Sequence, residues 1–453
     1  MAIAIVFGSQ AEAQTFANTS LHIFSTASVT TPHTNADGIS PRGGLILVSN
    51  TLYGMTYGGG SAGFGTIFRL NADGSGFTNL YNFTNGADGA HPSVGSTLAF
   101  YNNQLFGTTS FGGTNIPPKG AVFMINSDGT GFTNIYSFHG SDGQNPTAGL
   151  IVSGGVLYGT TYSGGGSGKH GTVFKINVDG SGFTNLYAFS TTDGSSPSAT
   201  LALSGNTLFG TTFYGSFSAG TVFMINTDGS AFTNLYTFTG GTNGSLPYAG
   251  VVQSGDWLLG TTSSGGAFTN YGIVYRINTD GTGFTNLHSF TGGSDSGSPF
   301  ASLVLVSNTL YGTALAGKAD FGTVYAINTD GTGFTNLYEF SGGSDGGAPG
   351  TPLILSGNTF YGTTDVGGSA YSTNGNGTVF GLTFPVSLRV ARSNASCTIS
   401  WPSPSTGFVL QQNSNLGTTN WTNSSFTIND DGATKSVTNL PLTGALFFRL
   451  RHP

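Results

Sequence analysis

Few acidic side chains in this 453-residue chain are placed where they could do chemistry. A glycosidase needs two carboxyl groups that face one bond, and Asp320 and Asp365 are the one pair of non-repeated acids in the loops that vary along the chain. Lys169 and His170, near Tyr162, would suit proton abstraction from an acidic sugar, with the lysine neutralising the sugar carboxylate and the histidine or tyrosine acting as base. These catalytic candidates also have a simpler interpretation, namely two aspartates placed by chance and a solvated basic loop tip.

Metal and cofactor chemistry has little support in the sequence. His33, His91 and His139 stand singly and lack the spacing of metal ligands. Neither an HExxH motif nor a Walker phosphate loop occurs, and the many glycine-rich stretches fit turns better than phosphate-binding loops. We therefore predict no metal and no cofactor. Catalysis stays an open question, and a non-catalytic role is favoured.

The elements that must position these side chains are repeated along the chain. A Gly-x-x-aromatic element occurs seven times, starting at Gly65, Gly120, Gly171, Gly220, Gly272, Gly322 and Gly377. An LYGTT-like element also occurs seven times, starting at Leu52, Leu105, Leu157, Leu208, Leu258, Leu310 and Phe360. An FTNLYxF-like element starts at Phe77, Phe132, Phe183, Phe232, Phe284 and Phe334. Each unit of roughly 50 residues holds four short β-type runs separated by turn residues, a pattern typical of a β-propeller blade.

The incomplete first and last units indicate how such a structure would close. The last unit lacks the FTNLYxF-like element, and the N-terminal segment Leu21-His22-Ile23-Phe24 repeats its ending. Pairing this N-terminal strand with the last unit would complete a seventh sheet and remove an open sheet edge. We therefore predict an all-β, seven-bladed β-propeller over residues 14–384, closed by an N-terminal fourth strand.

Both ends of the chain differ from the repeats. Residues 1–13 contain the apolar run AIAIVF followed by Ala-x-Ala, which we interpret as the end of a secretory signal peptide. In residues 385–453 the repeats stop, and Cys397, Ile399 and Trp401 alternate with polar residues. This segment is predicted to form a small antiparallel β-sandwich-like domain, with Cys397 in its core rather than acting as a reactive thiol.

The three repeated elements resemble those of the bacterial choice-of-anchor GloVer tandem-repeat proteins. The resemblance covers about residues 20–384, because seven units agree in the LYGTT, GTVFxINxDGT and FTNLYxF elements. It implies a protein that is secreted or held at the cell surface, and it implies no settled biochemical activity. Residues 385–453, with GFVLQ and FFRLR, resemble the small C-terminal β domains of secreted proteins from environmental bacteria.

One face of the predicted propeller carries loops that differ between units, and we call it the variable face. It consists of the loops between second and third strands and the loops between a fourth strand and the next first strand. Variable loops on a rigid scaffold are the usual place for binding. Aromatic residues in the first set of loops are the predicted ligand-binding residues: Tyr57, Phe111, Tyr162, Phe213, Tyr214, Tyr271 and Tyr371.

Two sets of repeated aspartates have structural and functional interpretations. One set precedes the first strands and consists of Asp37, Asp88, Asp142, Asp193, Asp295 and Asp345, with Asn243 in the fifth unit. These residues either shape turns, which we favour, or form a carboxylate ring that holds a cation at the channel mouth. The other set lies in the turns before the fourth strands: Asp73, Asp128, Asp179, Asp228, Asp280 and Asp330. A single carboxylate on a tight turn supplies too few oxygen ligands for calcium, so these are predicted to be turn residues.

Composition narrows the classes of partner. With 12 Lys and Arg residues against 19 Asp and Glu residues, the chain has no basic patch suited to nucleic acid. No stretch after the N-terminus approaches the roughly 20 apolar residues of a membrane span. The leading hypothesis is a secreted or surface-held, non-catalytic protein that binds glycan or another surface partner through the aromatic residues of the variable face. The alternatives are a polysaccharide lyase or hydrolase, and a structural protein whose low charge permits self-association.

Overall fold

The computed structural model describes thirteen segments of the chain. They are residues 16–92, 95–166, 168–215, 219–268, 270–315, 321–368, 375–384, 388–392, 397–402, 409–414, 420–430, 434–440 and 447–451. The interpreted signal segment, residues 1–13, lies outside them, as do Asp320 and Tyr371.

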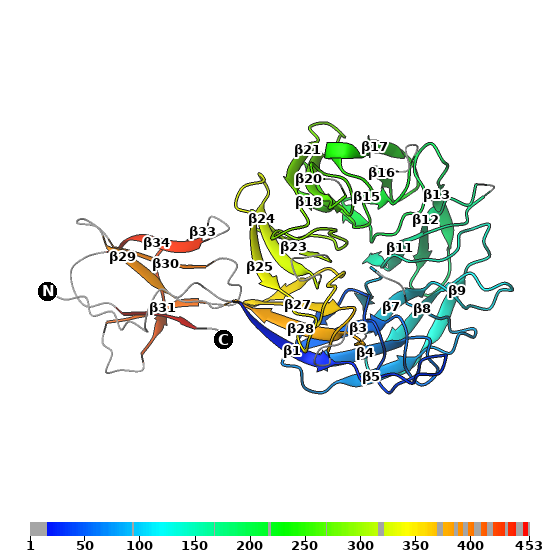
Figure 1. Cartoon of the computed structure of the whole chain (residues 1–453), viewed down its shortest axis with the longest axis horizontal. Helices are drawn as coiled ribbons and strands as arrows, with labels where there is room; N and C mark the ends of the chain where they lie inside the picture. The colour runs from blue at the N-terminus through cyan, green and yellow to red at the C-terminus, as the bar shows by residue number, and fades with distance from the viewer. Residues whose placement is uncertain are drawn as a thin grey trace.

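Four-stranded antiparallel sheets follow one another along the repeats, and each sheet uses one unit (Figure 1). The first three are β2 (Ile46–Val48), β3 (Thr51–Thr56), β4 (Thr66–Asn71) and β5 (Thr78–Asn82); β6 (Ala99–Tyr101), β7 (Gln104–Thr109), β8 (Ala121–Asn126) and β9 (Thr133–Ser137); and β10 (Ile151–Ser153), β11 (Val156–Thr161), β12 (Thr172–Asn177) and β13 (Thr184–Ala188). The next three are β14 (Ala202–Ser204), β15 (Thr207–Thr212), β16 (Thr221–Asn226) and β17 (Thr233–Thr237); β18 (Val252–Ser254), β19 (Trp257–Thr262), β20 (Ile273–Asn278) and β21 (Thr285–Ser289); and β22 (Val304–Val306), β23 (Thr309–Ala314), β24 (Thr323–Asn328) and β25 (Thr335–Glu339). Among the described residues, the one helical element is a single 3-10 turn, η1 (Gly241–Asn243).

The seventh sheet joins the two ends of the repeat region, as the sequence predicted. It consists of β26 (Ile354–Ser356), β27 (Thr359–Thr364), β28 (Thr378–Thr383) and the N-terminal strand β1 (Ala17–Ile23). Strand β1 pairs antiparallel with β28, from Ala17 opposite Thr383 to Ile23 opposite Thr378. Figure 1 shows β1 beside β28 in the ring of sheets. The predicted all-β, propeller-like fold is confirmed.

A close contact explains the glycine of the LYGTT element. In the first sheet, Phe68 lies on the strand next to Gly54, directly opposite it, and is fully buried. A Cβ atom on Gly54 would overlap the ring of Phe68. Gly107 and Gly159 have the same relation to Phe123 and Phe174. Only glycine leaves room for the third-strand aromatic ring, so the two repeated elements require each other.

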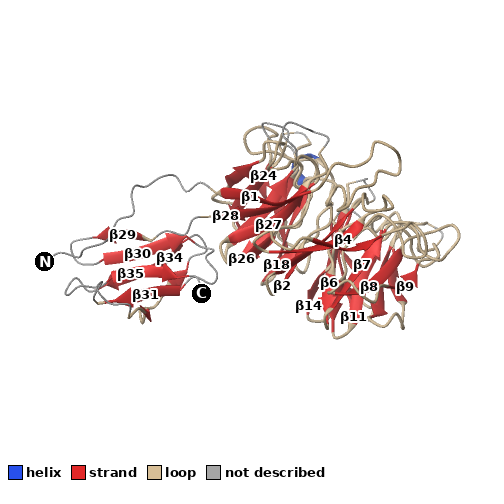
Figure 2. Ribbon diagram, turned by 90° about the horizontal axis from the view of Figure 1, so that it is seen from below, coloured by secondary structure: helices blue, strands red, loops and turns tan. Residues whose placement is uncertain are grey.

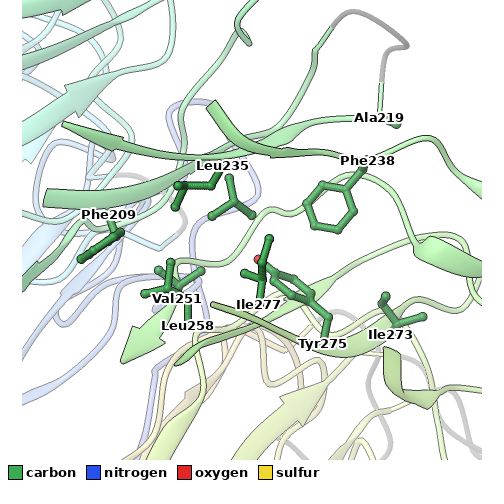
Figure 3. Close-up of a cluster of buried hydrophobic side chains, with 10 residues drawn as sticks. Phe209, Ala219, Leu235, Phe238, Val251, Leu258, Ile273, Tyr275 and Ile277 are labelled. Atoms are coloured by element: carbon green, nitrogen blue, oxygen red, sulfur yellow. The ribbon is translucent and has the colours of Figure 1, made fainter. Parts of the chain in front are cut away.

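Hydrophobic clusters lie between neighbouring sheets rather than within one sheet. One of them combines Phe209 and Val222 of the fourth sheet with Leu258, Tyr275 and Ile277 of the fifth, and Figure 3 shows side chains of this cluster. The cluster that closes the ring combines residues of the seventh and first sheets: Phe24, Tyr361 and Val379 with Leu45, Leu52, Phe68 and Leu70. Because each sheet buries its faces against two neighbours, the apolar runs on both faces of the strands are explained.

Stacked rings also connect the outer, fourth strands of successive sheets. Tyr81 stacks on Phe132 with ring centroids 3.8 Å apart, and Tyr187 stacks on Phe232 at 3.7 Å. His22 takes the tyrosine position in β1 and stacks on Phe77 at 3.6 Å. The first and fifth residues of the FTNLYxF-like element therefore link one sheet to the next.

After the repeats, the described residues form two smaller antiparallel sheets, which Figure 2 shows edge-on. One contains β29 (Arg389–Arg392), β30 (Cys397–Pro402), β34 (Thr434–Leu440) and β33 (Asn429–Asp430), and the other contains β32 (Thr422–Asn423), β31 (Val409–Asn413) and β35 (Phe447–Arg451). Cys397, Ile399, Trp401, Leu410, Val437 and Leu440 form a buried cluster of their own. The prediction that Cys397 is a core residue is confirmed, since its exposed fraction is 5%. The boundary at residue 384 stays a prediction, because residues 385–387 are outside the described segments.

Candidate functional site

A repeated backbone contact brings two variable positions together in every unit. A proline precedes each first strand, and the residue before it has a positive φ of 52–58° in all seven units. Its carbonyl oxygen accepts a hydrogen bond from the N–H of the residue that follows the second strand, as between Ser40 and Tyr57 (2.9 Å) and between Ala348 and Asp365 (3.2 Å). The residue after the proline and the residue after the second strand therefore lie beside each other on the variable face.

These two positions carry different side chains in each unit. The residues after the second strands are Tyr57, Ser110, Tyr162, Phe213, Ser263, Leu315 and Asp365. The described residues after the prolines are Arg42, Thr147, Ser198, Tyr248, Phe300 and Gly350. The first strand is an edge strand of each sheet, and it faces the inside of the ring, because β6 contacts β10 and β18 contacts both β14 and β22. The side chains that immediately precede them therefore gather around the mouth of the ring.

A pocket of about 240 Å³ lies at this mouth. Its lining residues are Pro41, Arg42, Tyr248, Phe300, Leu315, Ala348, Gly350, Thr351 and Asp365. They come from the first, fifth, sixth and seventh units, and they lie in the loops that the sequence assigned to the variable face. The pocket is thus built by segments that the closed ring brings together.

An ion pair between the first and last units forms the polar side of the pocket. Nε of Arg42 donates to Oδ1 of Asp365 at 2.8 Å, and both side chains are partly exposed. The hydrogen bond to Asp365 raises the pKa of the Arg42 guanidinium above its usual value. The guanidinium carbon of Arg42 also lies 5.3 Å from the ring centroid of Tyr57, within cation–π range. Asp365, predicted as one of a pair of acids, is therefore bound by a positive charge, and its predicted partner Asp320 lies outside the described residues.

Two aromatic rings also line the pocket, and the ring contacts continue beyond it. The rings of Tyr248 and Phe300 are 5.2 Å apart between centroids, and those of Tyr248 and Phe213 are 5.7 Å apart. Phe213 in turn contacts Tyr214 at 4.6 Å, and Tyr214 is 40% exposed. We call Phe300, Tyr248, Phe213 and Tyr214 the aromatic row. Burial raises the pKa of Tyr248 to about 12, so its phenol is neutral at physiological pH.

The other predicted aromatic residues that the structure describes lie outside the row. Tyr57 stacks on His91 at 4.6 Å, and Phe111 meets the edge of the same imidazole at 5.9 Å with 46% of its surface exposed. Tyr162 is half-buried and near enough to Tyr248 to influence its pKa. Tyr271 lies against Gly292 and Gly297 in the loop before the sixth first strand and does not line the pocket.

The backbone carbonyl groups of Lys169 and His170 accept hydrogen bonds that hold their loop in place. Lys169 is exposed, has a φ of 57°, and its carbonyl oxygen accepts from the N–H of Gly164 at 3.2 Å. The carbonyl oxygen of His170 accepts from the N–H of Ser196 at 2.8 Å, which ties this loop to the next unit. Neither residue lines the pocket, so the structure does not bring the basic pair and the pocket together.

The aspartates before the first strands shape turns, as the favoured interpretation held. Asp193 accepts from the N–H of Ser190 at 2.7 Å and from the hydroxyl of Tyr187 at 2.6 Å. Asp345 is bound in the same way by Ser341 and Tyr338, both at 2.9 Å. Because the tyrosines lie on the outer strands, these carboxylates face the outside of the ring. The alternative of a carboxylate ring at the mouth is wrong for this reason.

The aspartates before the fourth strands are turn residues as well. Each accepts from the N–H and the hydroxyl of the Ser or Thr two residues later, as Asp73 does from Ser75 at 2.9 and 2.6 Å. These hydrogen bonds lower the pKa of the Asp73 carboxyl below its ordinary value. The described residues contain no group of three or more His, Cys, Asp or Glu side chains that could hold a metal ion.

Of the residues that line the pocket, sequence reasoning identified only Asp365, and it missed the large side chains Arg42, Tyr248 and Phe300. All three directly follow the repeated proline, in the sequences Pro41-Arg42, Pro247-Tyr248 and Pro299-Phe300. Other described units carry Thr, Ser or Gly at that position. Large side chains at an otherwise small position were the available signal.

Comparison with known proteins identifies the repeats. The family model of the Gloeobacter/Verrucomicrobia repeat matches residues 19–169, 116–319 and 269–433. The chain belongs to this repeat family. The resemblance found in the three repeated elements is thereby confirmed. No curated protein sequence matches the chain, and no helix among the described residues is long and apolar enough to cross a membrane.

Several solved structures are distantly similar to this repeat protein. An oligogalacturonate lyase in complex with manganese is 12% identical with a TM-score of 0.48, and the match covers 82% of this chain and 99% of that one. The match to a nidogen/laminin complex is 14% identical with a TM-score of 0.41 and covers 64% and 93% of the two chains. TolB from Acinetobacter baumannii is 14% identical with a TM-score of 0.40, covering 60% and 59%.

Proposed function

We propose that this repeat protein is a non-catalytic binding protein that holds a glycan at the mouth of its ring. The observation that carries the proposal is the pocket on the variable face, which is lined both by the rings of Tyr248 and Phe300 and by the Arg42–Asp365 ion pair. Aromatic rings bind the apolar faces of sugars, and charged side chains bind their hydroxyl groups. Both kinds of group are present within one concave site.

The size of the pocket supports a small ligand unit. The volume of the pocket is about 240 Å³. Pockets for drug-sized molecules begin at about 300 Å³. One sugar ring therefore fits the size of this site better than a larger group.

Binding without catalysis is favoured by how the candidate catalytic groups are engaged. Asp365 is held by Arg42, whereas a general acid or base must exchange a proton with the substrate. Lys169 and His170 use their backbones to order a loop and do not line the pocket. We also propose that the protein acts outside the cell or at the cell surface, with carbohydrate or a surface component as partner, which fits the choice-of-anchor type of its repeats.

The test is a panel of glycans and polysaccharides presented to the full chain, with binding and released product measured together. We expect binding without product. Tyr248→Ala combined with Phe300→Ala should weaken binding at least about tenfold, because two stacking surfaces are lost. Tyr271→Ala, on the same face but outside the pocket, is the matched control and should bind as the unmodified chain does.

Two results would overturn the proposal. Release of product would show catalysis, and absence of binding across the panel would exclude a glycan ligand. Thermal unfolding of each variant shows whether a loss of binding reflects a loss of folding. Tyr248→Phe keeps the ring and should retain most of the affinity.

A further inference from the structure

The residues that line the pocket offer two kinds of chemistry to a ligand, charged and aromatic. The charged residues that line it are Arg42 and Asp365, and their opposite charges cancel. Of the Arg42 nitrogens, Nε is bound to Asp365, and the described residues show no hydrogen bond to its two Nη nitrogens. Oδ2 of Asp365 likewise has no recorded partner among the described residues. Donors and an acceptor thus lie side by side, which matches adjacent hydroxyl groups of a sugar.

This ion pair favours a neutral ligand over an acidic one. A carboxylate on the ligand would have to share Arg42 with Asp365 and would lie against the negative charge of that aspartate. Like charges in one site disfavour each other. A hydroxyl group can instead donate to Asp365 and accept from Arg42 without adding charge.

The aromatic row gives the site a direction. Phe300 and Tyr248 line the pocket, whereas Phe213 and Tyr214 continue away from it towards the loop tip of the fourth unit. Successive ring centroids are 5.2, 5.7 and 4.6 Å apart, so the rings form a continuous contact path. Tyr214 at the outer end is 40% exposed. Phe300, Tyr248 and Phe213 are partly exposed. Successive rings that reach the surface in this way can stack successive units of a chain-like ligand.

We infer that the pocket holds the terminal unit of a neutral glycan chain, whose next units stack along Phe213 and Tyr214. This inference rests on the proposed function and adds to it the charge class of the ligand and the direction in which the chain leaves the pocket. Arg42 and Asp365 bind hydroxyl groups of the terminal unit, and Tyr248 with Phe300 contacts its apolar face.

The test compares two series of probes with the full chain. One series consists of neutral cello-, manno- and xylo-oligosaccharides of increasing length, and the other of oligogalacturonates of matched lengths. We expect at least one neutral series to bind more tightly than the acidic one, with affinity that rises over the first few units and then levels. Tyr214→Ala should reduce by about tenfold the increase in affinity that longer oligosaccharides show. It should leave the affinity of the shortest probe that binds unchanged.

Two further variants separate binding from structure. Phe111→Ala removes an equally exposed ring on the same face that is outside the aromatic row, and it should leave every affinity unchanged. Asp365→Asn keeps the size of the side chain and removes its negative charge. It should shift preference towards oligogalacturonates by about tenfold, a change that a purely structural role would not produce.

The outcomes distinguish this inference from the proposed function. Preference of the unmodified chain for oligogalacturonates, or an unchanged length dependence in Tyr214→Ala, would overturn the inference while glycan binding stands. Absence of binding to either series and to the wider glycan panel would overturn both.

Discussion

Among the residues that the structure describes, two tyrosine hydroxyl groups are buried in the ring without a hydrogen-bond partner. Tyr275 and Tyr325 occupy the third-strand aromatic position of the fifth and sixth sheets and are fully buried. The other five sheets carry phenylalanine there, as at Phe68 and Phe123. Burial alone raises the pKa of Tyr275 and Tyr325 far above the usual tyrosine range. An unpaired buried hydroxyl group opposes folding because it loses its hydrogen bonds to water.

Replacing either tyrosine by phenylalanine is expected to stabilise the protein. Tyr275→Phe and Tyr325→Phe should each raise the free energy of unfolding by about 1 kcal/mol, because the unpaired hydroxyl is removed and the ring is kept. Tyr187→Phe is the matched control. It should lower the free energy of unfolding, since the hydroxyl of Tyr187 donates to Asp193 at 2.6 Å. Chemical denaturation measures all three, and a loss of stability in both Tyr275→Phe and Tyr325→Phe would contradict the expectation.

Among the elements, β1 has a special role because no turn joins it to its partner strand. In the other sheets a short turn connects the third and fourth strands, whereas β1 and β28 come from opposite ends of the repeat region. Phe24, which follows β1, is 3% exposed and packs between the seventh and first sheets. The ring is therefore held shut by packing and strand pairing at this point.

Truncating Phe24 is expected to loosen the ring at this closure. Phe24→Ala should cost about 3–5 kcal/mol of unfolding free energy, as does loss of a buried phenylalanine elsewhere. It should also speed hydrogen exchange selectively in β1 and β28, because no turn joins these two strands. Phe189→Ala, equally buried in a continuous sheet, should cost a similar amount. Equal exchange patterns in the two variants would show that the closure is no weaker than the other sheets.

At the scale of the whole molecule, the hydrophobic clusters divide into two kinds. Seven clusters each join residues of two neighbouring sheets of the ring. The buried residues of the eighth, Trp401 among them, come only from the two C-terminal sheets. Because shared clusters couple the sheets, the ring should unfold as one unit, and the C-terminal sheets should unfold separately.

A substitution in the eighth cluster tests this division. Trp401→Ala should lower the free energy of unfolding of the C-terminal sheets by about 3–5 kcal/mol, because Trp401 is 1% exposed. In calorimetry, the unfolding transition of the C-terminal sheets should move to a lower temperature, and the unfolding transition of the ring should stay unchanged. A shift of both transitions in Trp401→Ala would show that the two parts unfold together.

Much of the fold followed from local patterns in the sequence. Alternation of apolar residues and the Asp-Gly turns defined four strands per unit, and the displaced Leu21–Phe24 segment predicted the pairing of β1 with β28. The variable face was predicted from strand direction alone. Within that face, Phe213 and Tyr214 belong to the aromatic row, whereas Tyr271 packs over glycines of its neighbouring loop.

The repeated unit, its strands and the loops that vary can be read from the amino-acid sequence, because periodicity and turn chemistry are local properties of the chain. Which variable residues meet depends on how the sheets pack in three dimensions. Arg42 and Asp365 are separated by 323 positions and are brought to 2.8 Å by closure of the ring. Tyr248 and Phe300 join them because their units curve around the same axis. Such contacts depend on how the sheets pack against one another, and no local pattern in a single unit contains that information.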